Sequence, residues 1–179
     1  MEPHTYSWAQ ISVNALASRH IVSGVGDNEF APQKAITRAE FLKLMMEAYD
    51  LVKLGYTASF TDAKAGEWYY DSVASAQTMK IVSGYQDGSF GLNQCISREE
   101  MAVMSVRILK AAGIELPKTR AAVVFHDASQ IAGFAVSDIT TMSEAGWMEG
   151  QDLGNFAPKA QATRAETAVL IARMIGLND

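Results

Sequence analysis

Hydrophobic and polar positions along the chain recur three times in the same order. In each copy an aromatic residue precedes a glycine by 16 positions, the glycine precedes a phenylalanine by six, and the phenylalanine precedes an arginine by eight. The chain is therefore a tandem triplicate, and we expect its repeats at residues 1–56, 57–118 and 119–179. The matching residues are Trp8, Gly24, Phe30 and Arg38; Trp68, Gly84, Phe90 and Arg98; and Phe134, Gly150, Phe156 and Arg164.

The first segment of each copy predicts an amphipathic helix, because its apolar residues are spaced three to five apart. Trp8 and Trp68 are the first residues of the apolar stripe in their helices, so burial of their side chains in the core is favoured over stacking on a sugar ring. The stripe ends near a glycine in each copy, where a helix commonly closes with a left-handed residue. A turn follows, and the phenylalanine after it is expected to fill a hydrophobic socket. These glycines are Gly24, Gly84 and Gly150.

A second helix is predicted in each copy by a capping box. A Ser or Thr stands three positions before a Glu, the pattern in which each side chain satisfies a backbone N–H of the other residue. These residues need no ligand to explain them and are expected to support the helix start. The three boxes are Thr37 with Glu40, Ser97 with Glu100, and Thr163 with Glu166.

The second helices are apolar on more than one face, as Phe41, Leu42, Leu44 and Met45 illustrate. Such helices are mostly buried. One repeat has too few residues for a core of its own, so the three copies are expected to share one. We predict an all-α fold of three helix-loop-helix repeats in a pseudo-threefold spindle around a shared helical core. An open solenoid is the alternative geometry.

An arginine directly follows each helix cap: Arg38, Arg98 and Arg164. A cation there is unfavourable by about 0.3–1 kcal/mol, because the start of a helix carries a partial positive charge. An internal ion pair, with a carboxylate such as Asp62 or Asp127, would offset this cost. Alternatively, arginine and the free backbone donors bind an external carboxylate or phosphate.

Composition narrows the possible partners. Fifteen Lys and Arg stand against 20 Asp and Glu, giving a net charge of −5, so a broad grip on nucleic acid or an anionic membrane is not expected. No apolar run approaches the length that inserts into a bilayer. One cysteine and three scattered histidines offer no zinc pattern, and the turns lack the alternating acidic ligands of a calcium loop. We expect no metal and no cofactor.

The residues resemble the S-layer homology domain. The second copy carries Phe60-x-Asp62, Trp68, the run from Ile81 to Phe90, and Ser-Arg-Glu-Glu at 97–100. The first and third copies carry the family signature Thr-Arg-Ala-Glu at 37–40 and 163–166. The resemblance covers nearly the whole chain, and three tandem copies is the family's usual arrangement.

The resemblance implies a non-catalytic anchor that binds an anionic secondary cell-wall polysaccharide, commonly bearing a pyruvate ketal on N-acetylmannosamine. It implies grooves between adjacent repeats, a carboxylate-binding role for the signature arginine, and an extracellular location in the cell wall or S-layer. The chain would be fused to, or excised from, a larger exported protein; its first 15 residues lack a signal-peptide pattern. The expected ligand-binding residues are Arg38, Arg98, Arg164, Asp62, Asp127, Trp8, Trp68, Gly24, Gly84 and Gly150.

Departures from the signature suggest unequal grooves. Glu99 replaces the signature alanine beside Arg98, so we expect grooves built on Arg38 and Arg164 to be more competent in ligand binding than that of Arg98.

Two other classes of function stay open. A self-assembly module would use its apolar helices for subunit contacts. A glycosidase would pair carboxylates such as Glu40 and Glu166, but capping already explains both residues.

Overall fold

A computed structural model describes residues 6–22, 24, 29–151 and 154–177. In these ranges the regular structure is helical, with no strand beyond isolated bridges, which confirms the predicted all-α class. The helices are α1 (Ser7–Ser18), α2 (Arg38–Ala48), α3 (Tyr70–Thr78), α4 (Arg98–Ala111), the 3₁₀ turn η1 (Ala128–Gln130), α5 (Val136–Glu144) and α6 (Arg164–Met174). No described helix has both the length and the apolarity needed to cross a membrane.

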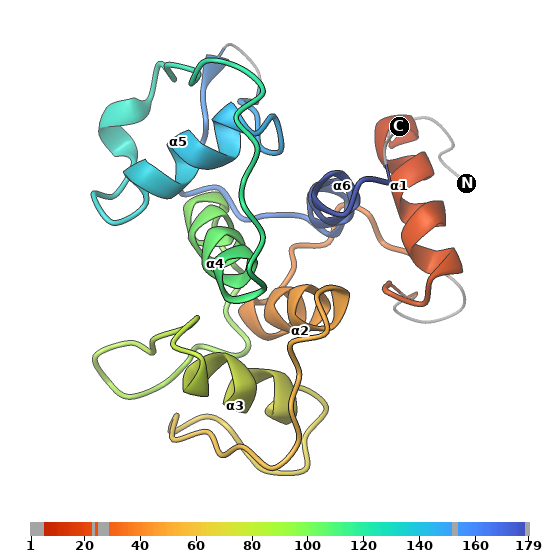
Figure 1. Cartoon of the computed structure of the whole chain (residues 1–179), viewed down its shortest axis with the longest axis vertical. Coiled ribbons are helices and arrows are strands. Elements are labelled where there is room, and N and C mark those ends of the chain that lie inside the picture. The colour runs from red at the N-terminus through yellow and green to blue at the C-terminus, as the bar shows by residue number, and fades with distance from the viewer. Residues whose placement is uncertain (1–5, 23, 25–28, 152–153, 178–179) are drawn as a thin grey trace.

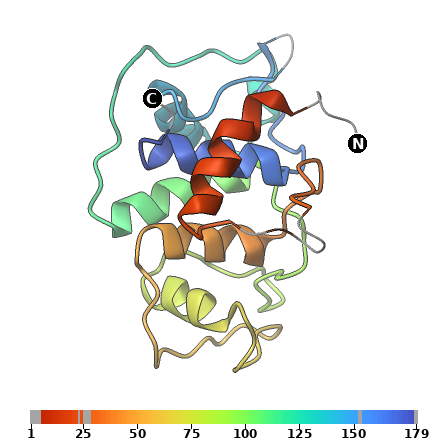
Figure 2. The same ribbon diagram turned by 90° about the vertical axis from the view of Figure 1, so that its right-hand side faces the viewer.

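The second helix of each repeat lies near the centre, and the first helix lies outside it (Figure 1). The outer helices pack on the neighbouring repeat: α3 contacts α2, α5 contacts α4, and α1 contacts α6. In the turned view α1 lies across α6 (Figure 2). Each helical pair therefore joins two repeats, and the last repeat returns to the first. This closed arrangement is not the open solenoid.

Three short extended segments, each just before a central helix, also close a ring. The N–H of Ile36 donates to the carbonyl of Ala162 at 3.0 Å, Ala162 donates to Ile96 at 2.9 Å, and Ile96 donates to Ile36 at 3.0 Å. All three side chains are fully buried. These bonds satisfy backbone groups that would otherwise be unpaired in the core. The ring supports the predicted pseudo-threefold spindle, which remains an interpretation of the overall shape.

One hydrophobic cluster draws on all three repeats, as expected for repeats too small to hold separate cores. Phe90 and Phe156 are fully buried, which confirms that they fill sockets, whereas Phe30 is only partly buried. The central helices are the most buried elements. Their fully buried side chains include Phe41, Leu42, Met45, Met46 and Ile108.

The prediction of left-handed glycines at the helix ends is wrong for Gly84 and Gly150, whose φ angles are not positive. The left-handed residue comes four positions earlier, at Lys80 (φ 58°) and Gly146 (φ 74°). Gly84 is required for space, because a Cβ there would lie 2.5 Å from the Ser89 carbonyl oxygen and 2.7 Å from the Phe60 ring. The glycine therefore permits close packing of the loop rather than a turn.

Candidate functional site

The three predicted capping boxes are all present. In the first, Thr37 N–H donates to Glu40 Oε2 at 2.9 Å, and Glu40 N–H donates to Thr37 Oγ1 at 3.2 Å. Ser97 with Glu100, and Thr163 with Glu166, repeat this geometry. One carboxylate oxygen of each glutamate thus fixes a helix start.

In the second and third repeats, the other carboxylate oxygen of the box glutamate accepts a hydrogen bond from the arginine of the preceding repeat. Arg38 Nη1 donates to Glu100 Oε1 at 2.7 Å, and Arg98 Nη1 donates to Glu166 Oε1 at 2.9 Å. Burial lowers the pKa of Arg164, and the charge of Glu40 opposes that effect. No local sequence pattern predicts this second role of the glutamates, because the partners are about 60 residues apart.

Each arginine also clamps the loop of the next repeat. Nε donates to the Phe90 carbonyl from Arg38 at 3.0 Å, and to the Phe156 carbonyl from Arg98 at 2.9 Å. Arg164 closes the ring by donating to Phe30 at 2.9 Å. Each guanidinium lies 4.8–5.0 Å from the ring centre of the phenylalanine it bonds. The arginines therefore hold the repeats together.

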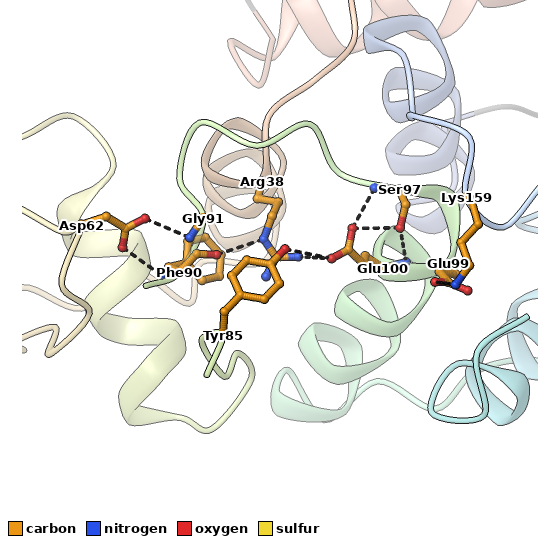
Figure 3. A network of polar contacts seen from close by, with 9 residues as sticks. All are labelled: Arg38, Asp62, Tyr85, Phe90, Gly91, Ser97, Glu99, Glu100 and Lys159. Carbon is orange, nitrogen blue, oxygen red and sulfur yellow. Dashed lines mark hydrogen bonds and ion pairs between the residues drawn. The ribbon is translucent and has the colours of Figure 1, made fainter. Parts of the chain in front are cut away.

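Figure 3 shows this arrangement around Arg38, whose guanidinium meets the Phe90 carbonyl and Glu100. As whole residues, Arg38, Arg98 and Arg164 are only 6%, 5% and 8% exposed. Arg38 and Arg98 form internal ion pairs, which is the first of the two interpretations that the sequence allowed. The expected partners, Asp62 and Asp127, were wrong. The partner glutamates reach the arginines because one carboxylate has an oxygen to spare after capping.

The two aspartates instead hold the loop backbone. Asp62 accepts hydrogen bonds from the N–H groups of Phe90, Gly91 and Leu92 at 2.8–3.0 Å. Asp127 accepts from Phe156 and Ala157, both at 2.8 Å. Successive amides that point to one carboxylate form an anion-binding nest, here filled by the protein's own side chain. The aspartates thus fix the loop that each arginine clamps.

Desolvation raises the pKa of Asp62, but its backbone hydrogen bonds outweigh that effect and hold the pKa below its usual value. A carboxylate with a lowered folded-state pKa stabilises the fold above its unfolded pKa of about 3.9, and this contribution is lost as the pH falls through the folded-state pKa. The same holds for Asp127. Desolvation raises its pKa, but the hydrogen bonds from the N–H groups of Phe156 and Ala157 help to hold the pKa below its usual value.

We therefore predict that Asp62→Asn costs about 1.5–3 kcal/mol of unfolding free energy at pH 7, the range for hydrogen bonds to a charged group. The cost should shrink as the pH falls below about 4, because the carboxylate of the unfolded chain takes up a proton at a higher pH than the folded carboxylate does. Urea unfolding of both proteins from pH 7 to pH 3 measures the difference. An equal difference at both ends of this range would contradict the assignment.

Three open grooves lie at equivalent places, and each contains a signature arginine, a box glutamate, a loop glycine and the aromatic residue that precedes a repeat glycine by 16 positions. Their volumes are about 380, 310 and 430 Å³. The arginine comes from the preceding repeat and the aromatic side chain from the following one. Groove 1 has Arg164, Glu40, Gly24 and Trp68; groove 2 has Arg38, Glu100, Gly84 and Phe134; groove 3 has Arg98, Glu166, Gly150 and Trp8.

The aromatic residues correct another expectation. Trp8 is 53% exposed, Trp68 is 56% exposed and Phe134 is 61% exposed, so none is a core residue. Trp68 lies just before α3 rather than inside it, which removes it from the apolar face inferred from spacing. Phe134 was not among the predicted ligand-binding residues, although the repeat pattern puts it in the position of the two tryptophans.

The predicted site residues thus fall into two sets. The arginines, glycines, tryptophans and box glutamates line the grooves. Asp62 and Asp127 line none of the three and act behind the loops. No cluster of three or more acidic, histidine or cysteine side chains suited to a metal occurs in the part of the chain that the structure describes.

Comparison with known proteins gives matches over nearly the whole chain. It is 33% identical over 166 residues to the exoglucanase XynX of Acetivibrio thermocellus, covering 92% of this chain and 15% of that protein. It is 30% identical over 172 residues to the surface-layer 125 kDa protein of Lysinibacillus sphaericus, covering 94% of this chain and 14% of the relative. A cellulosome-anchoring protein of Acetivibrio thermocellus is 28% identical over 151 residues, which is 82% of this chain and 33% of that protein.

The chain therefore spans a third or less of these relatives, and in the exoglucanase the match covers only a small part of the protein. The family model of the S-layer homology domain matches residues 1–42, 59–102 and 124–168, one segment in each predicted repeat. These three matches, in the order and number that the sequence pattern predicted, show that the chain belongs to the S-layer homology domain family.

Proposed function

We propose that this chain attaches a larger exported protein to the cell wall by binding an anionic wall polysaccharide in its inter-repeat grooves. The family is one of extracellular modules of the cell wall and S-layer, and its relatives here include a surface-layer protein and a cellulosome-anchoring protein. The proposed ligand is a polysaccharide that bears a pyruvate ketal on N-acetylmannosamine. Its carboxylate would meet an arginine, and its sugar face an aromatic ring.

The observation that carries this proposal is the repetition of one groove three times. In each groove an exposed aromatic side chain lies beside an arginine whose guanidinium is held in place. A single exposed aromatic side chain is ordinary on a protein surface, but an aromatic side chain exposed at the same position of all three repeats supports a ligand-binding role. A guanidinium suits a carboxylate because its donors match two oxygens at once.

The internal ion pairs limit how the arginine takes part. Arg98 uses Nε on Phe156, Nη1 on Glu166 and Nη2 on the Glu149 carbonyl, at 2.8–2.9 Å. This full set of partners supports the lower rank of the Arg98 groove in our proposal. Glu99, whose charge we expected to matter beside Arg98, instead pairs with Lys159 and accepts a hydrogen bond from Ala132 N–H at 3.1 Å. Asp62 and Asp127 would support the ligand only by shaping the loops.

Sedimentation with purified wall sacculi tests the proposal. We expect the chain to pellet with intact sacculi and to stay in the supernatant when the polysaccharide has been stripped from them. Analytical ultracentrifugation of the chain alone addresses the second candidate, self-assembly. Large assemblies without saccharide, together with equal pelleting on stripped sacculi, would favour that candidate and refute the anchor.

A further inference from the structure

The three grooves are equivalent in position but not in charge. Among the lining residues that the structure describes, groove 2 has two cations and one carboxylate, whereas grooves 1 and 3 each have two cations and two carboxylates, with histidine counted as neutral. The charged residues are Arg38, Arg107 and Glu100 in groove 2; Arg164, Lys43, Glu40 and Glu47 in groove 1; and Arg98, Arg173, Glu149 and Glu166 in groove 3.

We infer that groove 2 is the primary site for the acidic group of the ligand, with Arg107 as a second cationic contact beside Arg38. This inference rests on the proposed function and adds to it a rank among the grooves and a specificity-determining residue. The ligand class is a sugar that carries a carboxylate. Among the described lining residues, cations outnumber carboxylates only in groove 2, and local charge sets preference between sites of the same shape.

Arg38 has one guanidinium nitrogen that donates to none of the described residues, whereas all three guanidinium nitrogens of Arg98 donate hydrogen bonds. Nε and Nη1 of Arg38 bond the Phe90 carbonyl and Glu100, but Nη2 makes no hydrogen bond within residues 6–22, 24, 29–151 and 154–177. The Arg38 guanidinium lies between two rings, 4.8 Å from the centre of Phe90 and 5.0 Å from that of Tyr85. Tyr85 in turn donates to Glu100 at 3.2 Å. The remaining donor is therefore held in one orientation.

Arg107 lies on α4, is exposed, and lines the same groove. Its Nη1 donates to the carbonyl of Ile81 at 3.3 Å, which directs the guanidinium to the loop that forms one wall. The matching residue in groove 1 is Glu47, which pairs with Lys43 and so neutralises that cation. Phe134 supplies the ring of groove 2.

Groove 3 contains a matched counterpart, Arg173, whose Nη1 donates to the Trp147 carbonyl at 3.3 Å. Groove 3 differs in its wall, where Glu149 occupies the position of Ser83 in groove 2. Glu149 brings a carboxylate to the groove wall, where it pairs with Arg120 Nη1 at 2.8 Å, and its backbone carbonyl accepts a hydrogen bond from Nη2 of Arg98. The same arginine position therefore faces a wall with a serine in groove 2 and a wall with an acidic residue in groove 3, where Arg98 uses all three guanidinium nitrogens within the protein.

Isothermal titration calorimetry of the full chain, with the pyruvate ketal of N-acetylmannosamine methyl glycoside as probe, tests this inference. Arg107→Gln should weaken binding about tenfold or more, and Arg173→Gln less than about threefold. Ser83→Glu gives groove 2 the carboxylate of groove 3 and should weaken binding about tenfold without touching either arginine. Lys118→Gln, at a residue whose side chain is 72% exposed and outside all three grooves, controls for net charge.

Equal losses from Arg107→Gln and Arg173→Gln, or no loss from Ser83→Glu, would overturn the inference while wild-type binding upholds the proposed function. Failure of the wild-type chain to bind either the probe or wall sacculi would refute the proposed function itself. Thermal melting of each variant separates lost binding from lost folding. Arg107 is exposed, so its replacement should leave the melting temperature nearly unchanged.

Discussion

Replacing Arg98 with methionine should lower the free energy of unfolding by about 3–5 kcal/mol, the range for breaking a buried ion pair at one partner. Arg98 is 5% exposed and donates to two carbonyls and to Glu166. Its loss would remove the side-chain donor to the Phe156 and Glu149 carbonyls and would leave Glu166 Oε1 with Gln151 Nε2 in place of a cation; a buried acceptor without a partner carries its full desolvation cost. Since domains are stable by about 5–15 kcal/mol, this is a large share of the total.

Urea unfolding followed by circular dichroism measures the effect. Lys118→Met is a suitable control, because Lys118 is 72% exposed and its ion pair with Glu144 should contribute less than about 1 kcal/mol. A loss of under about 1 kcal/mol for Arg98→Met would show that the arginine is not a structural clamp. In that case its guanidinium would be free to serve a ligand alone.

Phe156→Ala should cost about 3–5 kcal/mol, the range for truncating a buried aromatic ring. Phe156 is fully buried, its ring centre lies 5.1 Å from that of Phe125, and the Arg98 guanidinium lies 5.0 Å from it. Truncation would remove the contact of the loop with the core and loosen the carbonyl that Arg98 clamps. Urea unfolding again provides the measurement.

Phe134→Ala offers the matched comparison, because Phe134 is the same residue type, is 61% exposed and lines groove 2. We expect its unfolding free energy to change by less than about 1 kcal/mol. Similar losses for the two phenylalanines would contradict the division between loop plugs and groove aromatics. The comparison therefore tests whether burial was correctly assigned to the two positions of the repeat.

Local sequence signals predicted the parts of the fold that depend on residues close in the chain. The capping boxes were found because Thr37 and Glu40 are three positions apart and satisfy each other's backbone groups. The burial of Phe90 and Phe156 followed from their place after a turn. The shared core followed from the size of one repeat.

Contacts between repeats could not be predicted from these local signals. Helical periodicity shows which face of α3 is apolar but not that it packs on α2 of the preceding repeat. The partner of Arg38 was misassigned to an aspartate because no spacing rule links it to Glu100. Trp68 was assigned to the core because the apolar stripe was extended past the start of α3.

The residues of the site also divide into those that the repeat pattern predicted and those that only the folded structure brings together. The repeat alignment identified the arginines, glycines and tryptophans that line the grooves. It did not identify Arg107 or Arg173, since an arginine nine residues into a helix has an ordinary surface role. Charge differences between grooves arise from side chains of three separate segments, and only the folded arrangement brings them together.

Calorimetric titration with the pyruvate ketal of N-acetylmannosamine, beside the same sugar without its ketal, tests the anchor most directly. Both sugars offer a face to the groove aromatics, but only the ketal offers a carboxylate to the arginines. We predict saturable binding of the ketal and at least about tenfold weaker binding of the neutral sugar. Equal affinities, or no heat from either sugar, would contradict the account.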